Sequence, residues 1–404
     1  MFQRTIGLYR ESFGGLPREI WSLSAVMLIN RSGTMVIPFL TIYLTQTLGF
    51  SLVQAGYVMS FFGAGSLVGT ILGGRLTDRI GQYPVQMGSL FLTGIAFLIL
   101  MFIKSFWGIC AGIFLATVVA DAFRPANMAA IAVYSSARLH TRSVALNRFA
   151  INLGFSIGPA VGGFIMAHLG GQWLFIVDGI TCIVAGFLFW YIIPHKVEIK
   201  EEEETETTTT PKGKKVYQDK YFMLFVFFQL LVFMAFFQMF NSIPVYFKEI
   251  LLLSEDQIGA LLAMNGLLIV MIEMPLIYKL EHIANKLRLI NLGTFIISAG
   301  FFLLLINSSW AGIAVIFMFF LTFGEIISFP FGNSYALSKA NPKNRGRYMA
   351  VYGMSFSIAV ILSPLIGMQI ADHFGFSTLW LFLGGISMIS VAGLYWLSEV
   401  DGRK

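Results

Sequence analysis

The chain has 404 residues, of which 57% are hydrophobic and 12% are charged, and its mean hydropathy is +0.77. Soluble domains carry about 25% charged residues, so this chain is too apolar to cover a water-facing surface and must use a lipid bilayer as its main solvent. The net charge of +6 does not indicate a nucleic-acid partner, because the basic residues lie mostly between the apolar runs.

Apolar runs long enough to cross a bilayer follow one another along the chain. A span needs about 20 apolar residues, and a run of this length must pair its own backbone groups in lipid, which indicates helices. In the first half the predicted spans are 19–46, 53–76, 83–103, 106–134, 143–168 and 172–194. In the second half they are 221–248, 256–280, 287–306, 310–337, 347–371 and 376–398. The start of the chain lacks the features of a cleavable signal, so the first run is expected to remain as an anchor.

A polar stretch separates the two groups of six spans. It contains the acidic run Glu201–Glu204, then consecutive threonines and several lysines, a composition typical of a solvated tether. The predicted domains are an N-terminal six-helix bundle (1–194), a cytoplasmic linker (195–220) and a C-terminal six-helix bundle (221–404).

The positions of the basic residues predict the orientation of the spans, since cytoplasmic loops carry an excess of Lys and Arg. With the N-terminus inside, nearly all of the 27 Lys and Arg fall on the cytoplasmic side. Lys104 and Lys248 are expected on the outer side, while Arg31 and Arg124 fall within spans. We therefore predict a multi-pass protein of the plasma (inner) membrane with both termini in the cytoplasm.

The two halves of the sequence repeat. A shift of 205 residues places 125–170 on 330–375 without a gap. The identities are Pro125/Pro330, Arg142/Arg347, Pro159/Pro364, Gly162/Gly367, His168/His373 and Gly170/Gly375. They fall on helix-shaping residues in matching spans, which predicts parallel repeats related by an axis along the membrane normal.

The segment 73–81 lies in a very short polar gap between the second and third spans, where a tight cytoplasmic hairpin is expected. Together with the twelve spans, the repeat and the linker, it resembles the major facilitator superfamily over essentially the whole chain. That family has a signature of glycine-x-leucine-alanine-aspartate-arginine-x-glycine and two basic residues in this loop. The matching residues are Gly74, Asp78, Arg79 and Gly81, whereas Gln82 and Tyr83 replace the basic pair.

The resemblance implies that this loop is a moving part of an alternating-access carrier. In the family the loop aspartate contacts the start of span eleven when the carrier faces outward. We accordingly predict that Asp78 contacts Arg345 or Arg347 in the outward-facing state and loses that contact in the inward-facing state.

A second segment, 154–163, resembles the fifth-helix motif associated with antiporters, mainly drug:proton exporters. Its marked residues are Gly154, Gly158, Pro159, Gly162 and Gly163. The glycines recur every four residues and form a flat strip for close helix packing, and the proline loosens the helix.

Two other spans carry similar strips, Gly65, Gly69 and Gly73 in span two and Ala359, Ser363 and Gly367 in span eleven. Because helices two and eleven, and five and eight, meet across the bundles in the family, we expect these strips to permit rocking. Generic packing within a bundle is the alternative.

Ionisable residues at membrane depth are costly and usually functional. Here they are Arg31, Asp121, Arg124, Glu273 and Glu325, with Asp178 nearer the outer surface. Burial in a medium of low dielectric favours the neutral form of a carboxyl group, so such a group can exchange protons near neutral pH. We expect Glu325 to be the leading proton-coupling site, followed by Asp121 and Glu273.

Each of these residues also has a less functional interpretation. Asp121 and Arg124 are three residues apart and could neutralise one another. Glu273 precedes a proline and could support helix packing. Arg31 needs an acidic partner, either Glu325 or Asp121, or an anionic substrate group. The expected substrate-cavity residues are Arg31, Asn30, Arg124, Gln238, Asn241, Asn265, Tyr43 and Asn333.

These observations favour a secondary active transporter that moves small amphipathic molecules by alternating access, as proton-coupled efflux. A proton-coupled importer of peptides or another nutrient, or a lysolipid carrier, is the alternative. Peptide carriers have a glutamate-x-x-glutamate-arginine cluster in span one, where this chain has Met27, Asn30 and Arg31. We expect no enzyme activity, no metal site and no cofactor other than a proton gradient. The expected partners are the substrate, protons and the bilayer, without nucleic acid, and the chain is expected to be a monomer.

Overall fold

The computed structural model describes residues 14–136, 139–194, 216–280, 285–306, 310–340 and 345–401. The side chains of Thr141, Met274, Tyr278 and Arg345 also lie outside this description. Within these residues, eleven helices are long and apolar enough to cross a membrane. Most of the predicted linker (195–220) lies outside the described residues.

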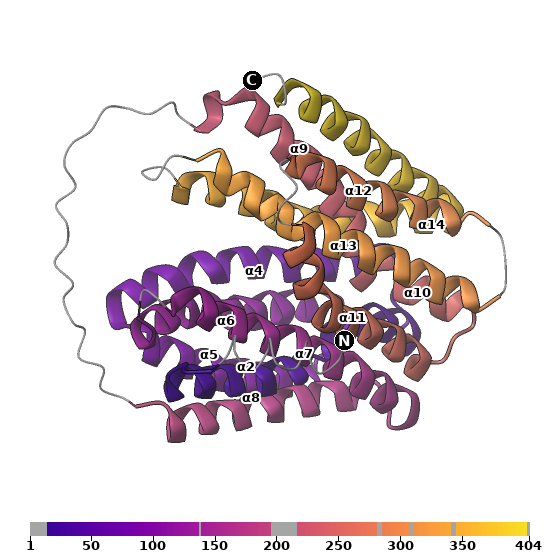
Figure 1. Ribbon diagram of the computed structural model, residues 1–404. Coiled ribbons are helices and arrows are strands. Elements are labelled where there is room, and N and C mark those ends of the chain that lie inside the picture. The colour runs from indigo at the N-terminus through magenta and orange to yellow at the C-terminus, as the bar shows by residue number, and fades with distance from the viewer. Residues whose placement is uncertain are drawn as a thin grey trace. The chain divides into compact units, whose positions relative to one another are not determined.

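The first half of the chain forms its helices close to the predicted spans (Figure 1). Span one is divided into α2 (Arg18–Ser32), α3 (Val36–Ile42) and a π-helical turn (Tyr43–Thr47). The others are α4 (Leu52–Ile80), α5 (Gln82–Leu100), α6 (Phe106–Tyr134), α7 (His140–His168) and α8 (Gln172–Ile192).

The second half follows the same order. A short 3-10 turn (Val216–Gln218) precedes α9 (Lys220–Phe236), a 3-10 turn (Phe237–Phe240) and α10 (Ser242–Glu249), which together form span seven. Next come α11 (Glu255–Leu280), α12 (Lys286–Leu303), α13 (Gly312–Ser338) and α14 (Arg345–Asp401). At 57 residues, α14 would be about 86 Å long if straight, more than twice the roughly 30 Å of a hydrocarbon core. Gly375 interrupts it with a φ of 83°, so α14 contains both predicted final spans.

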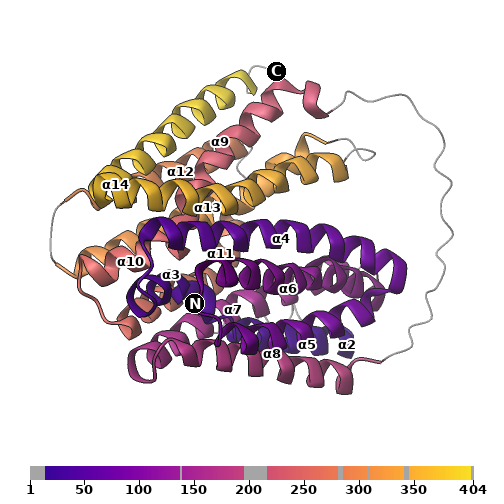
Figure 2. The ribbon, with the colours of Figure 1, turned by 180° about the vertical axis from the view of Figure 1, so that it is seen from behind.

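The helices group into two compact units. Unit 1 consists of Met1–Ile37 and Ala64–Glu204, and unit 2 consists of Pro38–Gly63 and Thr205–Lys404. In unit 1, α2 packs on α7 and α8, and α5 packs on α6 and α8. In unit 2, α14 packs on α9 and α12, and α12 packs on α13. Figure 2 shows the two groups of helices from behind. Residues 38–63, which the sequence assigned to the first bundle, thus group with unit 2.

Residues that match in the internal repeat also have matching places in the backbone. Pro125 and Pro330 both lie inside helices, α6 and α13. Gly170, which follows α7, and Gly375, inside α14, both adopt a positive φ, at 97° and 83°. A positive φ is strained for residues with a Cβ, so the repeat places glycine where each half turns between its last two spans.

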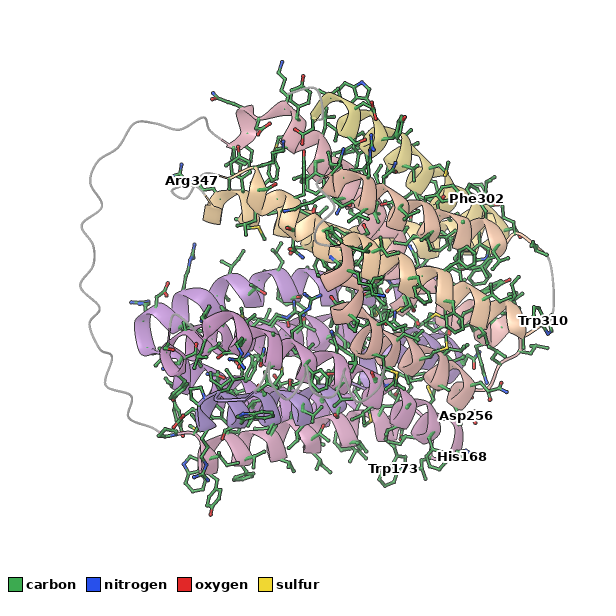
Figure 3. All side chains as sticks on the ribbon, in the orientation of Figure 1. His168, Trp173, Asp256, Phe302, Trp310 and Arg347 are labelled. Carbon is green, nitrogen blue, oxygen red and sulfur yellow. The ribbon has the colours of Figure 1, made fainter. Side chains whose placement is uncertain are left out.

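Within each unit, the turns between helices lie at two opposite ends of the bundle. In Figure 3, His168 and Trp173 lie together at the turn between α7 and α8 in unit 1. In unit 2, Asp256 and Trp310 lie at the end opposite Arg347. This arrangement is what antiparallel neighbours joined by short connections produce.

The first span of each half is broken near its middle. In span one the helix stops at Ser32 and restarts at Val36, and in span seven a 3-10 turn and Asn241 separate α9 from α10. The repeat shift of 205 residues carries 33–35 onto 238–240, so the breaks occupy equivalent positions. Broken helices leave backbone groups that need partners at membrane depth, where broken spans line cavities in many carriers.

Candidate functional site

Arg31 lies in the last turn of α2, directly before the break in span one. Its guanidinium carbon lies 5.7 Å from the centre of the Phe155 ring on α7, within cation–π range. Its Nε is buried and has no hydrogen-bond partner among the described residues. The charged side chains of Arg124, Asp121 and Asp178 are within electrostatic reach of Arg31. The structure therefore keeps this cation inside unit 1, close to two acids.

Asp121 and Arg124 form an ion pair on one face of α6. The Arg124 Nε lies 2.8 Å from Asp121 Oδ1, and Ser66 on α4 donates a hydrogen bond to Oδ2. The Asp121 side chain is 7% exposed, whereas that of Arg124 is 47% exposed. The ion pair that the three-residue spacing suggested is therefore present, and it places a permanently charged guanidinium beside Asp121.

Glu325 on α13 is held by a polar group from α11. The Asn265 Nδ2 lies 3.1 Å from Glu325 Oε2 and 3.0 Å from the hydroxyl oxygen of Thr322. Thr322 and Asn265 are both buried. One amide therefore fixes the carboxylate of Glu325 between two helices of unit 2.

Glu273 lies on α11 immediately before the Met274–Pro275 irregularity. Its side chain is 5% exposed, and Pro275 sits inside the helix. Its predicted role in proton coupling remains a prediction.

The other predicted cavity residues are mostly engaged within the protein. Gln238 is 1% exposed and donates to the carbonyl oxygen of Ser363 at 2.9 Å, and it accepts from Ser242. Asn241 donates to the Phe237 carbonyl at 2.7 Å. The Asn241 contact satisfies a carbonyl beside the break in span seven, and the Gln238 contact joins this break to α14. Both residues therefore act at least as packing groups there.

The remaining three lie in different settings. Asn30 donates to the Cys182 thiol at 3.5 Å, and Tyr43 is 2% exposed in the π-helical turn. Asn333 is exposed and donates to its own helix, at the carbonyl of Phe329. A place for these residues on the substrate path remains a prediction.

The small-residue strips contact different helices from those expected. A Cβ placed on Gly154 would lie 2.5 Å from the Cβ of Arg31, and one on Gly158 would lie 2.8 Å from the Thr34 carbonyl oxygen. These two glycines of the span-five strip therefore pack on the break of span one inside unit 1. Our expectation that this strip faces span eight was wrong for these two glycines, because the broken backbone of span one needs the close approach.

The strip of span two shows the same correction. Cβ atoms on Gly65, Gly69 and Gly73 would lie within 2.1–2.5 Å of α6 atoms, from Phe114 to Ala122. This strip therefore also serves packing inside unit 1. The α4 face that meets α14 carries other residues, which were not predicted from the sequence.

That face consists of Gly56, Ser60 and Gly63, all within unit 2. A Cβ on Gly56 would lie 2.8 Å from the Pro364 carbonyl oxygen, and one on Gly63 would lie 3.0 Å from the Ile361 backbone nitrogen. Ser60 donates to the Ile361 carbonyl oxygen at 3.0 Å. Their spacing of three to four residues is the signal by which this face could have been found.

The strip of span eleven faces span seven. Ser363 donates to the Met234 carbonyl at 2.9 Å, and a Cβ on Gly367 would lie 2.3 Å from Gln238 Nε2. Since Ser363 is the repeat partner of Gly158, each half packs a small-residue strip against the break in its own first span.

Comparison with known proteins identifies the family. The profile of the Major Facilitator Superfamily matches residues 21–348 and 250–404. This chain belongs to the Major Facilitator Superfamily. It is 24% identical over 409 residues to a "Na(+), Li(+), K(+)/H(+) antiporter" of Planococcus maritimus, covering 93% of this chain and 94% of the relative. It is 25% identical over 383 residues to the "Uncharacterized MFS-type transporter YttB" of Bacillus subtilis (strain 168), covering 93% and 94%.

Solved structures show the same fold. A POT family transporter in complex with 5-aminolevulinic acid matches with a TM-score of 0.80 and 16% identity, covering 96% of this chain and 97% of that chain. A mutant of the nucleoside transporter NupG matches with a TM-score of 0.75 and 13% identity, covering 94% and 100%. At these identities the likeness concerns the fold alone. The protein is thus a transporter with the all-α superfamily fold, and its relatives are transporters, not enzymes.

The superfamily loop between spans two and three is mostly helical here. α4 continues through Asp78 and Arg79 to Ile80, and only Gly81, with a φ of 87°, separates it from α5. The expected hairpin is therefore a one-residue turn at a glycine. Asp78, Arg79 and Arg347 are not buried, and Gly74 has open space around it. The side chain of Arg345 lies outside the described residues, and the predicted contact of Asp78 remains a prediction.

One buried polar pair was missed from the sequence. Asn127 on α6 donates to Asn147 on α7 at 3.2 Å, and both are nearly inaccessible. Asn127 follows Arg124 by three residues, so the polar run of α6 extends from Asp121 toward Asn127. The three-residue spacing of Asp121, Arg124 and Asn127 could have indicated it.

Proposed function

We propose that this transporter is a proton-coupled antiporter that exports small amphipathic molecules, with Glu325 as its proton-carrying group. The observation that carries the proposal is the hydrogen bond by which the Asn265 amide holds the Glu325 carboxylate between α11 and α13. Asp121 is less suited to the role, because it lies 2.8 Å from the permanently charged Arg124. A coupling group must lose and regain its proton in each cycle, and an adjacent guanidinium opposes the neutral form.

The fifth-helix motif and the relatives support antiport over import. The motif 154–163 resembles that of drug:proton exporters, and a full-length relative is named as an antiporter of monovalent cations and protons. Exchange of Na⁺, Li⁺ or K⁺ for protons is therefore a second candidate function. Peptide import has less support, because Met27 is buried in the apolar core of unit 1 and Asn30 bonds to a thiol.

A proteoliposome assay with an imposed pH gradient tests the proposal. A pH-sensitive dye reports proton movement while amphipathic dyes, Na⁺, Li⁺, K⁺, peptides and lysolipids are added one class at a time. The proposal expects proton movement that depends on amphipathic dyes and runs opposite to them. Dependence on a monovalent cation alone would favour the second candidate. Peptide or lysolipid uptake in the direction of the proton gradient would overturn the proposal.

A further inference from the structure

The break in span one is closed by a carboxylate from another helix. The Asp178 Oδ2 on α8 lies 3.3 Å from the backbone nitrogens of both Met35 and Val36, which donate to it. The Val36 nitrogen stands at the start of α3, among the groups that a helix leaves without internal partners. The Met35 nitrogen precedes α3 and also donates to the Gly33 carbonyl oxygen at 2.7 Å. Asp178 therefore does from a neighbouring helix what an N-cap residue does within a chain.

The site is dry enough for these bonds to matter. Asp178 is 2% exposed, Met35 is 4% exposed and Val36 is 1% exposed. An unpaired backbone N–H at this depth is costly, and so is a buried carboxylate without donors. Asp178 gains two backbone donors here, and the Val36 nitrogen gains an acceptor.

The same turn of α8 holds the α2 side of the break. A Cβ on Gly33 would lie 1.9 Å from the hydroxyl oxygen of Thr181, so the backbone of the break rests directly on α8. Asn30 donates to the Cys182 thiol, and this thiol lies 4.0 Å from Asp178 Oδ1. Arg31 lies between these two anchored sides, within electrostatic reach of Asp178.

Among the described residues, this arrangement is found in unit 1 and not at the equivalent positions of unit 2, which argues against a requirement of the fold. The repeat shift of 205 residues places Asp178 on Leu383 and Arg31 on Phe236, both buried and apolar. At the break in unit 2, the carbonyl oxygens of Met234 and Phe237 accept instead from the Ser363 hydroxyl and the Asn241 amide. The fold can thus close such a break with neutral groups, and unit 1 uses a carboxylate where it also carries an arginine.

We propose that Asp178 is a positioning residue for transport, which caps α3 from α8 and thereby holds Arg31 in place at the break of span one. The proposal rests on the proposed function only in taking span one as part of the transport path. It predicts that Asp178→Ala removes the hydrogen-bond acceptor of Met35 and Val36 and loosens the break in span one. Asp178→Asn, a neutral acceptor of the same size, should retain the cap. Asparagine is as good an N-cap as aspartate.

Cys182 provides a built-in reporter. The chain has two cysteines, so Cys110→Ser leaves Cys182, which is 2% exposed, as the only thiol. In this background we compare Asp178→Ala with Asp178→Asn by the rate of Cys182 alkylation with N-ethylmaleimide in proteoliposomes. Losing the cap should raise the rate about tenfold in Asp178→Ala, and Asp178→Asn should stay near the parent.

Transport kinetics distinguish positioning from mere stability. Asp178→Ala should raise the KM for the substrate found in the proteoliposome panel, and it should add little to Arg31→Ala, because residues that act through one another are not additive. Asp178→Asn should keep the larger part of the transport rate. If Asp178→Ala is not recovered folded, Asp178→Asn alone decides by the same two readouts.

Three results would overturn the proposal. The first is an Asp178→Ala variant in which Cys182 stays protected from alkylation and the KM is unchanged. Another is full additivity of Asp178→Ala with Arg31→Ala. The third is loss of proton coupling in Asp178→Asn while Cys182 stays protected from alkylation. That result would make Asp178 a proton site instead. The alkylation readout needs neither substrate nor protons, so failure of proton-coupled export would leave it intact.

Discussion

Asn265 on α11 donates a hydrogen bond to Glu325 on α13, with 3.1 Å between Nδ2 and Oε2. The bond joins two helices of unit 2 through one amide, which also reaches Thr322 at 3.0 Å. Hydrogen bonds to a charged group are stronger than those between neutral groups. The bond of this amide to the Glu325 carboxylate is therefore stronger than its bond to the Thr322 hydroxyl.

Replacing Asn265 with alanine should lower proton-coupled transport. Loss of a charge-assisted hydrogen bond costs about 1.5–3 kcal/mol, so we expect a rate reduction of about tenfold or more. Initial rates in proteoliposomes with a fixed pH gradient measure it. Thr322→Val is the matched control, because it removes the other partner of the amide and leaves the bond to Glu325. Equal losses in both variants would contradict this assignment.

The ion pair on α6 should contribute to stability. Removing Arg124 leaves the buried Asp121 without its cation, and because Arg124 is half-exposed we expect a loss of only about 1–2 kcal/mol. Thermal unfolding followed by size-exclusion chromatography should rank Arg124→Ala below the parent. The double variant Asp121→Asn/Arg124→Gln should recover much of the loss, since neither residue of the pair then carries a charge. A double variant less stable than Arg124→Ala would argue against the pairing.

The strip of span five should tolerate no side chain at Gly158. A Cβ there would lie 2.8 Å from the Thr34 carbonyl oxygen, so Gly158→Leu should force α7 away from the break of span one. We expect poor recovery of folded protein and loss of transport. Gly88→Ala is the control, because this α5 glycine has open space and alanine favours helix by about 0.5–1 kcal/mol. Normal transport by Gly158→Leu would show that the strip does not pack closely.

The contact between α4 and α14 should break in each transport cycle. A Cβ on Gly56 lies 2.9 Å from that of Met368, slightly closer than the roughly 3.5–4.5 Å of a disulfide. The pair Gly56→Cys/Met368→Cys, with Cys110 and Cys182 replaced by serine, should therefore cross-link on oxidation. Transport should stop on oxidation and return with dithiothreitol, while each single variant stays insensitive. Full transport by the cross-linked protein would mean that these helices need not separate.

The helices could be predicted from the sequence to within a few residues, but their breaks could not. Hydropathy reports where lipid begins and ends, so α6 and α8 agree with their predicted spans. Because hydropathy marks only the apolar run, the predicted second span ended at residue 76, whereas α4 continues through Asp78 to Ile80. The break between Ser32 and Val36 stayed hidden because the apolar run is continuous there and its partner, Asp178, lies far away in the sequence.

The site could be predicted only in part, for the same reason. Spacing along one helix was enough to suggest the pairing of Asp121 with Arg124. Which helix a small-residue strip meets is decided by tertiary packing, so Gly154 and Gly65 were assigned to the wrong neighbours. Asn265 was selected for its polarity, but its bond to Glu325 joins residues 60 positions apart, and no local pattern indicates that.

The most direct test of the central claim compares the parent with Glu325→Gln in two assays on the same proteoliposomes. The first measures substrate-dependent proton movement under a pH gradient, and the second measures substrate exchange at equal pH on both sides. We predict that Glu325→Gln abolishes the proton signal and retains exchange, because glutamine keeps the hydrogen bond of Asn265 but carries no exchangeable charge. A proton signal equal to that of the parent would contradict the assignment of Glu325 as the proton-carrying group.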